Sequence, residues 1–119
     1  MSEITGEASV RVEVPGDRPL VVNMGTESVD DVYSVMANEH RRHALAVIAR
    51  EPEAMNVSRL VEQVADRLKP EPTEAASDRS LRELRVSLHH QHLPKMVSAG
   101  LVEYDAENRT VKPTSAIVT

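Results

Sequence analysis

The stretch HLPKMVSAGLVEYD, residues 92–105, contains the point where a helical pattern gives way to a strand pattern. A long helix is predicted from about Arg79 to Ala99, and Gly100 follows it at the position where helices commonly end in a left-handed residue. The segments LVEYD and RTVKP, residues 101–105 and 109–113, flank the tripeptide AEN and predict an antiparallel hairpin. The C-terminal part of the fold is therefore a long helix followed by a two-stranded hairpin.

Shorter helical patterns precede this stretch. Ser28 is predicted to cap the first helix, with acidic residues in its first turn, where the helix dipole favours them. Its apolar face is expected to hold Val29, Val32, Tyr33 and Met36.

A bend near Asn38 is predicted to begin a second helix, which Pro52 stops. This helix has an apolar face, and Arg41 and Arg42 are expected outside it. After a short extended segment at Met55 and Val57, Ser58 is predicted to cap a third helix. Its buried stripe is expected to be Leu60, Val61, Val64, Ala65 and Leu68. Residues 69–78 are expected to form a loop, because they hold two prolines and no apolar period.

The N-terminal segment SVRVEVPGDRPLVVN, residues 9–23, alternates apolar and polar residues around a turn sequence. This pattern predicts a β-hairpin, and the alternative is an acidic arm without fixed structure. We divide the chain into an N-terminal acidic arm or β-hairpin over residues 1–27, a main domain over residues 28–113 and a C-terminal tail over residues 114–119.

The composition limits the class of protein. A chain of 119 residues fits one domain, and the absence of cysteine excludes disulfides and thiolate metal sites. The first residues do not resemble a signal peptide, and no apolar run is long enough to span a membrane. We therefore expect a soluble, cytoplasmic protein with no membrane partner.

The charge is unevenly distributed along the chain. The formal net charge is −5, which weakly opposes a nucleic-acid partner. Residues 1–31 are strongly acidic, whereas residues 79–96 hold four basic residues against Glu83 alone. The predicted long helix is thus a basic segment in an acidic protein. The preference for arginine over lysine and the excess of acids fit a protein that stays hydrated in high salt.

Two apolar stripes lie on the predicted long helix, about a quarter-turn apart at roughly 100° per residue. Leu93, Met96 and Val97 form one stripe, with Val86 and His89 near it. The second holds Leu81, Leu84 and Leu88. Pro94 removes a helical hydrogen bond and is expected to kink the helix. Two stripes suggest two packing partners, the core of the domain and a second subunit.

The face opposite Leu93 and Met96 is polar and basic. Its short or forked polar groups can bond to base edges, and cationic side chains around them can neutralise phosphates. Further polar and basic residues lie at or after the tip of the hairpin and suit phosphate or minor-groove contacts, and the alternative is that they are ordinary turn residues. The candidate DNA contacts are Arg82, Arg85, Ser87, His90, Gln91, Lys95, Asn108, Arg109 and Lys112.

The histidines of HHQHLPK, residues 89–95, resemble metal ligands only in part. His89 and His92 share a face, but His90 points elsewhere, and a zinc site usually needs three or four ligands. We expect His89 and His92 to be half-buried, with no bound metal and no cofactor. The residues of EHRRH, positions 39–43, are interpreted either as contacts to the DNA backbone or as a solvated face. No glycine-rich phosphate loop, carboxylate pair or catalytic triad is recognisable, so no enzymatic activity is expected.

The residues support a family resemblance. The segment VYSVMANEHRRHALAVIA is similar to the first helices of ArsR-like winged-helix regulators, and HLPKMVSAGLVEYD resembles the end of their recognition helix and the start of their wing. The segment SLHHQHLPK most resembles the small winged-helix domains of halophilic archaea. The resemblance covers roughly residues 29–113. ArsR-type sensors bind metals mostly through cysteines, so metal sensing is not carried over.

The expected fold is α+β and mainly helical, a winged helix-turn-helix domain with a C-terminal two-stranded wing and an N-terminal β-hairpin arm. The resemblance implies a transcription regulator that binds double-stranded DNA, as a homodimer whose recognition helices read two half-sites. The alternative is a winged-helix protein–protein interaction module that does not bind DNA.

Overall fold

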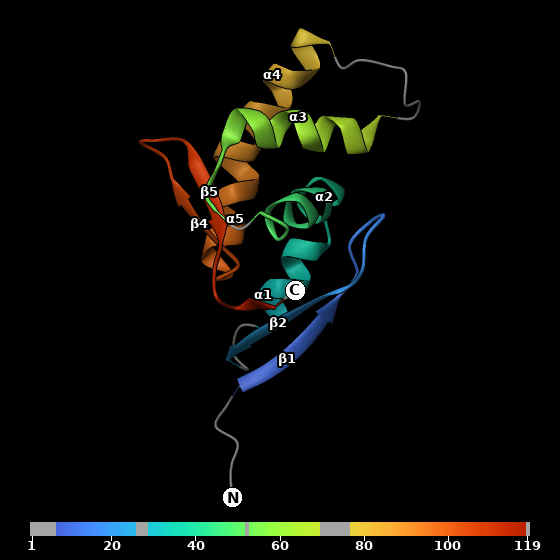
Figure 1. Cartoon of the computed structure of the whole chain (residues 1–119), viewed down its shortest axis with the longest axis vertical. Coiled ribbons are helices and arrows are strands. Elements are labelled where there is room, and N and C mark those ends of the chain that lie inside the picture. Colours follow the sequence, from blue (N-terminus) through green and yellow to red (C-terminus); the bar gives the residue numbers. More distant parts are fainter. Residues whose placement is uncertain (1–6, 26–28, 52, 70–76, 119) are drawn as a thin grey trace, which may run out of the picture.

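The computed structural model describes residues 7–25, 29–51, 53–69 and 77–118 (Figure 1). Helices lie between two small antiparallel sheets, so the coarse α+β class is confirmed. The helices are α1 (Val29–Met36), α2 (Glu39–Ile48), α3 (Val57–Leu68), α4 (Asp78–Ser87) and α5 (Leu93–Ser98), with a π-helical turn η2 (Leu88–His92) between the last two. The strands are β1 (Glu7–Val12), β2 (Leu20–Gly25), β3 (Met55–Asn56), β4 (Val102–Asp105), β5 (Thr110–Pro113) and β6 (Ile117–Val118). None of the helices in these four ranges has the length and apolar character needed to cross a membrane.

The N-terminal hairpin predicted from the alternating pattern is confirmed. β1 and β2 pair antiparallel with Val12 opposite Leu20, and Val10, Val12 and Val14 turn their side chains into the core. The C-terminal strand β6 pairs with the other edge of β2, where Val22 lies opposite Ile117. The first and last parts of the chain therefore form one sheet of order β1-β2-β6.

Side chains of capping residues mark where α2 and α3 begin. Asn38 caps α2, because its side-chain oxygen accepts from the Arg41 backbone N–H at 3.2 Å. The cap of α3 is Asn56, whose Oδ1 accepts from the Ser58 N–H at 2.7 Å, so the prediction of Ser58 as cap is wrong by two residues. The reason is that strand β3 ends at Asn56, and the residue that leaves a strand with extended backbone is placed to cap the next helix. The predicted cap Ser28 and most of the predicted loop at 69–78 lie outside the described residues.

The buried face of α1 differs from the prediction, because Val35 is buried where Tyr33 was expected. Val32 and Val35 are fully buried, whereas Tyr33 is 58% exposed. The predicted stripe of α3 is confirmed at Leu60, Val61 and Val64, which lie in the core, whereas Ala65 and Leu68 are half-buried against it.

The predicted long helix is interrupted by the π-helical turn η2. The Leu93 N–H donates to the Leu88 carbonyl five residues earlier, and Pro94 follows at the start of α5. Pro94 has no N–H that could donate to the His90 carbonyl, and the wider turn accommodates this missing helical hydrogen bond.

This wider turn changes the meaning of the two apolar stripes. A π-turn adds one residue to the helix, which is worth about 100° of rotation. The extra residue brings the stripes onto one face, and Leu84, Leu88, Leu93 and Met96 all lie in the core of the same chain. The interpretation of the second stripe as a contact with a second subunit is therefore wrong. Val97, assigned to the first stripe, is 42% exposed.

The end of α5 and the following hairpin are as predicted. Gly100 has φ +78°, its N–H donates to the Val97 carbonyl at 2.9 Å, and the Leu101 N–H donates to the Met96 carbonyl at 3.1 Å. These two bonds satisfy carbonyls that the helix end leaves free. β4 and β5 pair antiparallel, and β3 adds to β5, which gives a second sheet of order β3-β5-β4.

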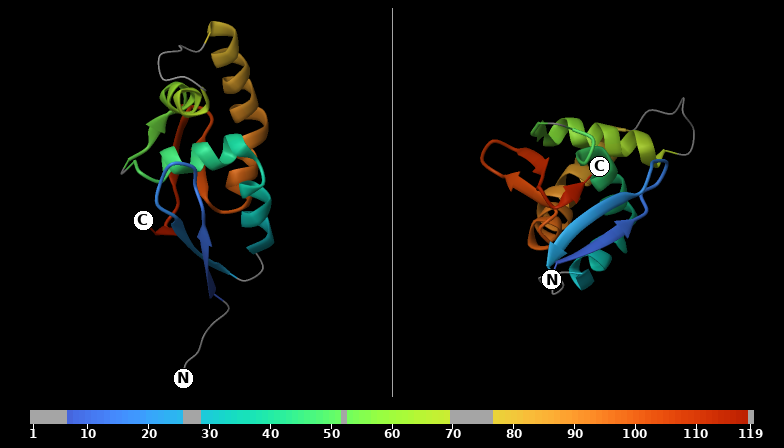
Figure 2. Two further views of the ribbon diagram at one scale, coloured as in Figure 1. Left: turned by 90° about the vertical axis from the view of Figure 1, so that its right-hand side faces the viewer. Right: turned by 60° about the horizontal axis from the view of Figure 1, so that its bottom comes forward.

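The two sheets lie on different sides of the helices. Figure 2 shows the β1-β2-β6 sheet and the start of α4 at opposite ends of the molecule. The β4–β5 hairpin stands beside α5 and the start of α3. This arrangement places the hairpin next to the predicted polar face of the α4–η2–α5 segment.

Candidate functional site

The predicted DNA-contact residues lie on two neighbouring parts of the structure. All are exposed except Ser87, which is half-buried. The α4–η2–α5 segment carries Arg82, Arg85, Ser87, His90, Gln91 and Lys95, and the β4–β5 hairpin carries Asn108, Arg109 and Lys112.

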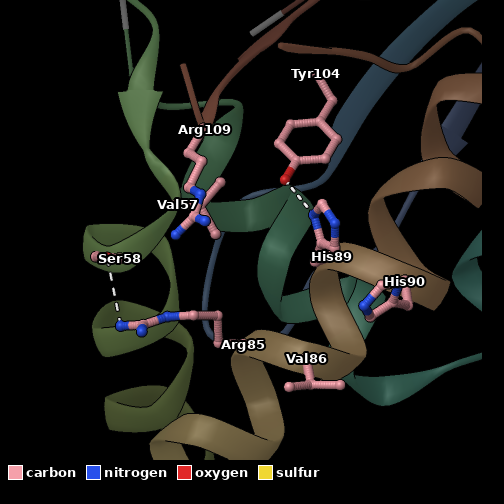
Figure 3. A pocket seen from close by; sticks show the side chains of 8 residues that line it. All are labelled: Val57, Ser58, Arg85, Val86, His89, His90, Tyr104 and Arg109. Atoms are coloured by element: carbon pink, nitrogen blue, oxygen red, sulfur yellow. Dashed lines mark hydrogen bonds between the residues drawn. The ribbon is translucent and has the colours of Figure 1, made fainter. Parts of the chain in front are cut away.

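Three of these residues meet in one pocket. Its volume is about 170 Å³, and it opens between the start of α3, the α4–η2 segment and the β4–β5 hairpin (Figure 3). The lining residues are Val57 and Ser58 from α3, Arg85 and Val86 from α4, His89 and His90 from η2, and Tyr104 and Arg109 from the hairpin. Arg85, His90 and Arg109 are thus brought together from segments up to 24 residues apart in the sequence.

Hydrogen bonds fix two walls of the pocket. Arg85 Nη2 donates to Ser58 Oγ at 3.4 Å, so the guanidinium reaches from α4 across to α3 (Figure 3). On the other wall, His89 Nδ1 and Tyr104 Oη lie 2.6 Å apart. Burial raises the pKa of Tyr104, and Arg109 nearby acts in the opposite direction. The Tyr104 hydroxyl therefore stays protonated at neutral pH and can donate a hydrogen bond to His89 Nδ1.

The remaining predicted residues lie outside this pocket. The Asn108 side-chain amide donates to Asp105 Oδ2 at 2.7 Å, which stabilises the hairpin turn. Lys112 Nζ lies 3.7 Å from Glu103 Oε1 across the hairpin. Asn108 and Lys112 therefore have roles within the hairpin, in line with the alternative that they are ordinary turn residues. Arg82, Ser87, Gln91 and Lys95 do not line the pocket.

Four basic residues of this region differ in their ion pairs from most others in the protein. Most of the other arginines and lysines, Lys112 included, lie within 4 Å of a carboxylate, for example Arg50 beside Asp17 at 2.8 Å. Within the four described ranges, no carboxylate lies within that distance of Arg82, Arg85, Lys95 or Arg109. Their charges remain available to an anionic ligand.

Arg41 is buried, contrary to the prediction that it lies outside the apolar face. Its guanidinium donates to the carbonyls of Val35 at 2.9 Å and Ser34 at 3.3 Å, and Nη1 lies 3.1 Å from His92 Nδ1. A sequence signal was present, because Arg41 precedes the buried Leu45 and Ile48 at intervals of four and seven residues.

His43 is also buried. Arg67 Nε donates to His43 Nδ1 at 3.2 Å, and burial, followed by the charge of Arg67, lowers the pKa of His43. Neither interpretation of EHRRH, backbone contact or solvated face, therefore holds for Arg41 and His43.

The histidines of residues 89–92 do not converge on one point. His89 lies against Tyr104, whereas His92 is 2% exposed and lies against Arg41. Burial, followed by the charges of Arg41 and His40, lowers the pKa of His92 to about 4. The expectation of a half-buried side chain is confirmed for His89, whereas His92 is fully buried and so lies deeper than expected. Among the described residues, no group of three or more histidine or carboxylate side chains is placed to hold a metal ion.

The fold and the pocket define a small α+β protein with a cationic pocket between helices and a hairpin. Residues 33–112 match the family described as Domain of unknown function (DUF7344), and the chain belongs to this family. The match spans all the pocket residues and leaves β1, β2 and β6 outside it. No curated protein and no solved structure matches the chain.

Proposed function

We propose that this chain is a DNA-binding transcription regulator of the winged-helix type. In this proposal the α4–η2–α5 segment is the recognition helix and the β4–β5 hairpin is the wing. The order of the elements supports it, because helices, a short strand, two further helices and a hairpin follow one another along the chain. The pairing of β3 with β5 is a second support, since it ties the hairpin to the helical part of the domain.

One observation carries the proposal. Arg82, Arg85 and Arg109 are exposed, and the described part of the chain provides no carboxylate partner for them. Arg82 and Arg85 are three residues apart on α4 and therefore neighbours on its surface. In a protein of net charge −5, such a group of free cations is what neutralisation of DNA phosphates requires.

The residues of the recognition helix would have two different roles. Arg82, Arg85 and Lys95 would neutralise phosphates, which fixes position without reading sequence. Gln91 is exposed and bears a side-chain amide, which can bond bidentately to an adenine edge in the major groove. Ser87 and His90 would add bonds of either kind.

The first experiment is a chromatin pull-down of the tagged protein, followed by binding titrations on an enriched duplex and a scrambled duplex. Replacing Arg82 with Gln should weaken binding to both duplexes and reduce the salt dependence by about one charge. Replacing Gln91 with Ala should cost about 1–3 kcal/mol on the enriched sequence and almost nothing on the scrambled one.

The matched control is Arg79→Gln. Arg79 is exposed on the same helix, but its Nε bonds to Glu83 at 3.2 Å, so its loss should change binding least. Equal losses for Arg79→Gln and Arg82→Gln would contradict the proposed face, and failure to enrich discrete sites would contradict the proposed function.

A homodimer is part of this proposal and rests on the family resemblance. Two recognition helices would then contact half-sites about one helical turn apart. The apolar stripe of α4 does not supply the interface, because Leu84 and Leu88 are buried within the chain. Sedimentation of the protein with and without its duplex tests this point, and one chain per duplex would contradict it.

A protein–protein interaction module is the second candidate. The observation that favours it is the exposure of Val21 and Val118 on the neighbouring strands β2 and β6, at 38% and 45%. In that function the N-terminal sheet would be the docking surface, and the substitutions on α4 would change nothing.

A further inference from the structure

We infer that the pocket between α3, α4, η2 and the β4–β5 hairpin binds a phosphate group. A free phosphate monoester and a phosphate of the DNA backbone are two sources of this group, and they would compete for the pocket. The inference deepens the proposed function and rests on it where the phosphate belongs to DNA.

The lining of the pocket is cationic and polar. Arg85 and Arg109 provide two guanidinium groups, and Ser58, His89, His90 and Tyr104 provide further polar groups, while none of the described lining residues is acidic. A guanidinium fork matches the oxygens of a phosphate in a bidentate way. Two forks suit a tetrahedral phosphate with several oxygens better than a carboxylate with only two.

The Arg85 side chain and the backbone at Arg109 are held by hydrogen bonds before any ligand binds. Arg85 is bonded to Ser58 on the facing helix. Arg109 has a left-handed backbone with φ 56°, and its carbonyl accepts from the Val57 N–H at 2.9 Å. The hairpin is therefore attached at Arg109 to the first residue of α3. The bonded Arg85 side chain loses less conformational entropy on binding than a free one, and the bonded backbone keeps Arg109 at the edge of the pocket.

The start of α3 adds to the positive potential. Val57 and Ser58 belong to the first turn of this helix, which carries no acidic residue. The N-terminal end of a helix bears a partial positive charge that favours anions. The cavity of about 170 Å³ is large enough for a phosphate group and part of the group attached to it.

The direct test uses the free protein without DNA. Inorganic phosphate and phenyl phosphate are titrated into the ¹⁵N-labelled protein at constant ionic strength, with potassium acetate and potassium chloride as comparison salts. Both phosphates should give saturable, one-site shifts at the amides of Ser58, Arg85 and Arg109, and the comparison salts should not. Shifts spread over the basic residues of the whole surface, or no saturation, would overturn the inference.

Variants test which residues hold the phosphate. Replacing Arg85 or Arg109 with Gln should weaken phosphate binding by about ten- to a hundredfold, the usual effect of losing bonds to a charged group. The control Arg82→Gln changes an exposed arginine of α4 that does not line the pocket, so phosphate affinity should stay the same. Equal affinity for all three variants and the unchanged protein would overturn the inference.

A competition experiment separates the two sources of phosphate. Phenyl phosphate should displace a labelled duplex from the unchanged protein at concentrations that saturate the pocket. Arg82→Gln should weaken duplex binding and leave phenyl phosphate binding intact. Binding of phenyl phosphate without binding of any duplex would leave the pocket inference standing and remove the proposed function. Duplex binding without any binding of phosphate, or competition by it, would overturn the pocket inference and leave the proposed function standing.

Discussion

At the scale of single residues, Arg41 shows how a charged side chain can be part of the core. It is 8% exposed, and its guanidinium connects the carbonyls of Ser34 and Val35 near the end of α1 with His92 in η2. Burial lowers the pKa of Arg41, but the ordinary value is so high that the group stays charged at neutral pH. Arg41 therefore links three helical segments through one cation.

Replacement of Arg41 with Ala should destabilise the protein by about 2–4 kcal/mol, because buried acceptors lose bonds to a charged donor. Chemical denaturation measures this change. The control is Arg42→Ala, since Arg42 is only half-buried and, among the described residues, donates to one backbone carbonyl, that of Met36, at 2.9 Å. Equal losses for the two variants would contradict the assigned role.

His92 should make the stability depend on pH. Its folded-state pKa is about 4 against an ordinary value of 6.5, so between these values the unfolded chain binds a proton that the folded chain does not. The contribution to stability is complete above pH 6.5 and is lost as the pH falls toward 4, by about 3 kcal/mol in total.

The measurement is the free energy of unfolding from pH 7 to pH 4 for the unchanged protein and for His92→Gln. The substituted amide would keep an acceptor for Arg41 and cannot titrate, so the variant should lose less stability over this range. His43 is present in both proteins and its contribution cancels. Parallel pH profiles for the two proteins would show that His92 is not the titrating group.

At the scale of elements, the π-turn η2 decides which residues of the last helix are buried. Leu88 and Leu93 are both fully buried although they are five residues apart, a spacing that a regular α-helix places on different faces. The wider turn keeps both in the core and leaves His90 and Gln91 exposed. π-turns inside α-helices frequently occur at functional sites, and here the turn lies beside the proposed phosphate pocket.

The role of η2 is tested by two deletions, both made in a Pro94→Ala background, because a regular α-helix would set the Pro94 ring against the carbonyl four residues earlier. In that background, deletion of the exposed Gln91 should leave the fold intact. It would place Leu88 and Leu93 four residues apart, which is the spacing of a regular α-helix, so both can remain buried. Deletion of the exposed Lys95 is the control, because it would place Leu93 and Met96 two residues apart and turn one of them outward. Deletion of Lys95 should lower the free energy of unfolding by about 2–5 kcal/mol, which is the usual effect of losing a large core side chain. Thermal melting compares the two deletions, and equal destabilisation would contradict this account of η2.

At the scale of the whole molecule, the two ends of the chain join in one sheet. β6 pairs with β2, and the Asn23 N–H donates to the Ala116 carbonyl at 2.7 Å. The sheet packs its valines against the helical core, which includes residues from both ends of the chain. The N-terminal hairpin is therefore held by the C-terminal residues as well as by its own pairing.

Truncation after Thr114 should destabilise the protein by about 1–3 kcal/mol, because β2 loses a few hydrogen bonds of about 1 kcal/mol each. Truncation after Thr114 keeps the bond from the Thr114 hydroxyl to the Gly100 carbonyl. The control is Val118→Thr, which changes a side chain that is 45% exposed and preserves the backbone bonds. Amide exchange of β2 should rise in the truncated protein only, and unchanged exchange would show that β6 does not hold the sheet.

The sequence by itself determined the local features of this protein. Gly100 and Asn38 mark helix boundaries through bonds to residues only a few positions away. The β1–β2 and β4–β5 hairpins follow from alternation around short turns. The basic character of the residues around Arg85 was also visible, since charge is a property of composition. Capping, turn formation and periodicity depend on near neighbours, so a single sequence contains their signal.

Only the tertiary structure decided which faces meet. Pro94 marks where the last helix is interrupted, but only core packing shows that the π-turn brings the buried residues on both sides of it onto one face. Arg41 is buried because carbonyls near the end of α1 and His92, 51 residues away, surround it. The pairing of β6 with β2 and the meeting of Arg85 with Arg109 also join distant segments. Such contacts depend on how all the apolar faces are buried together, and no local pattern carries that information.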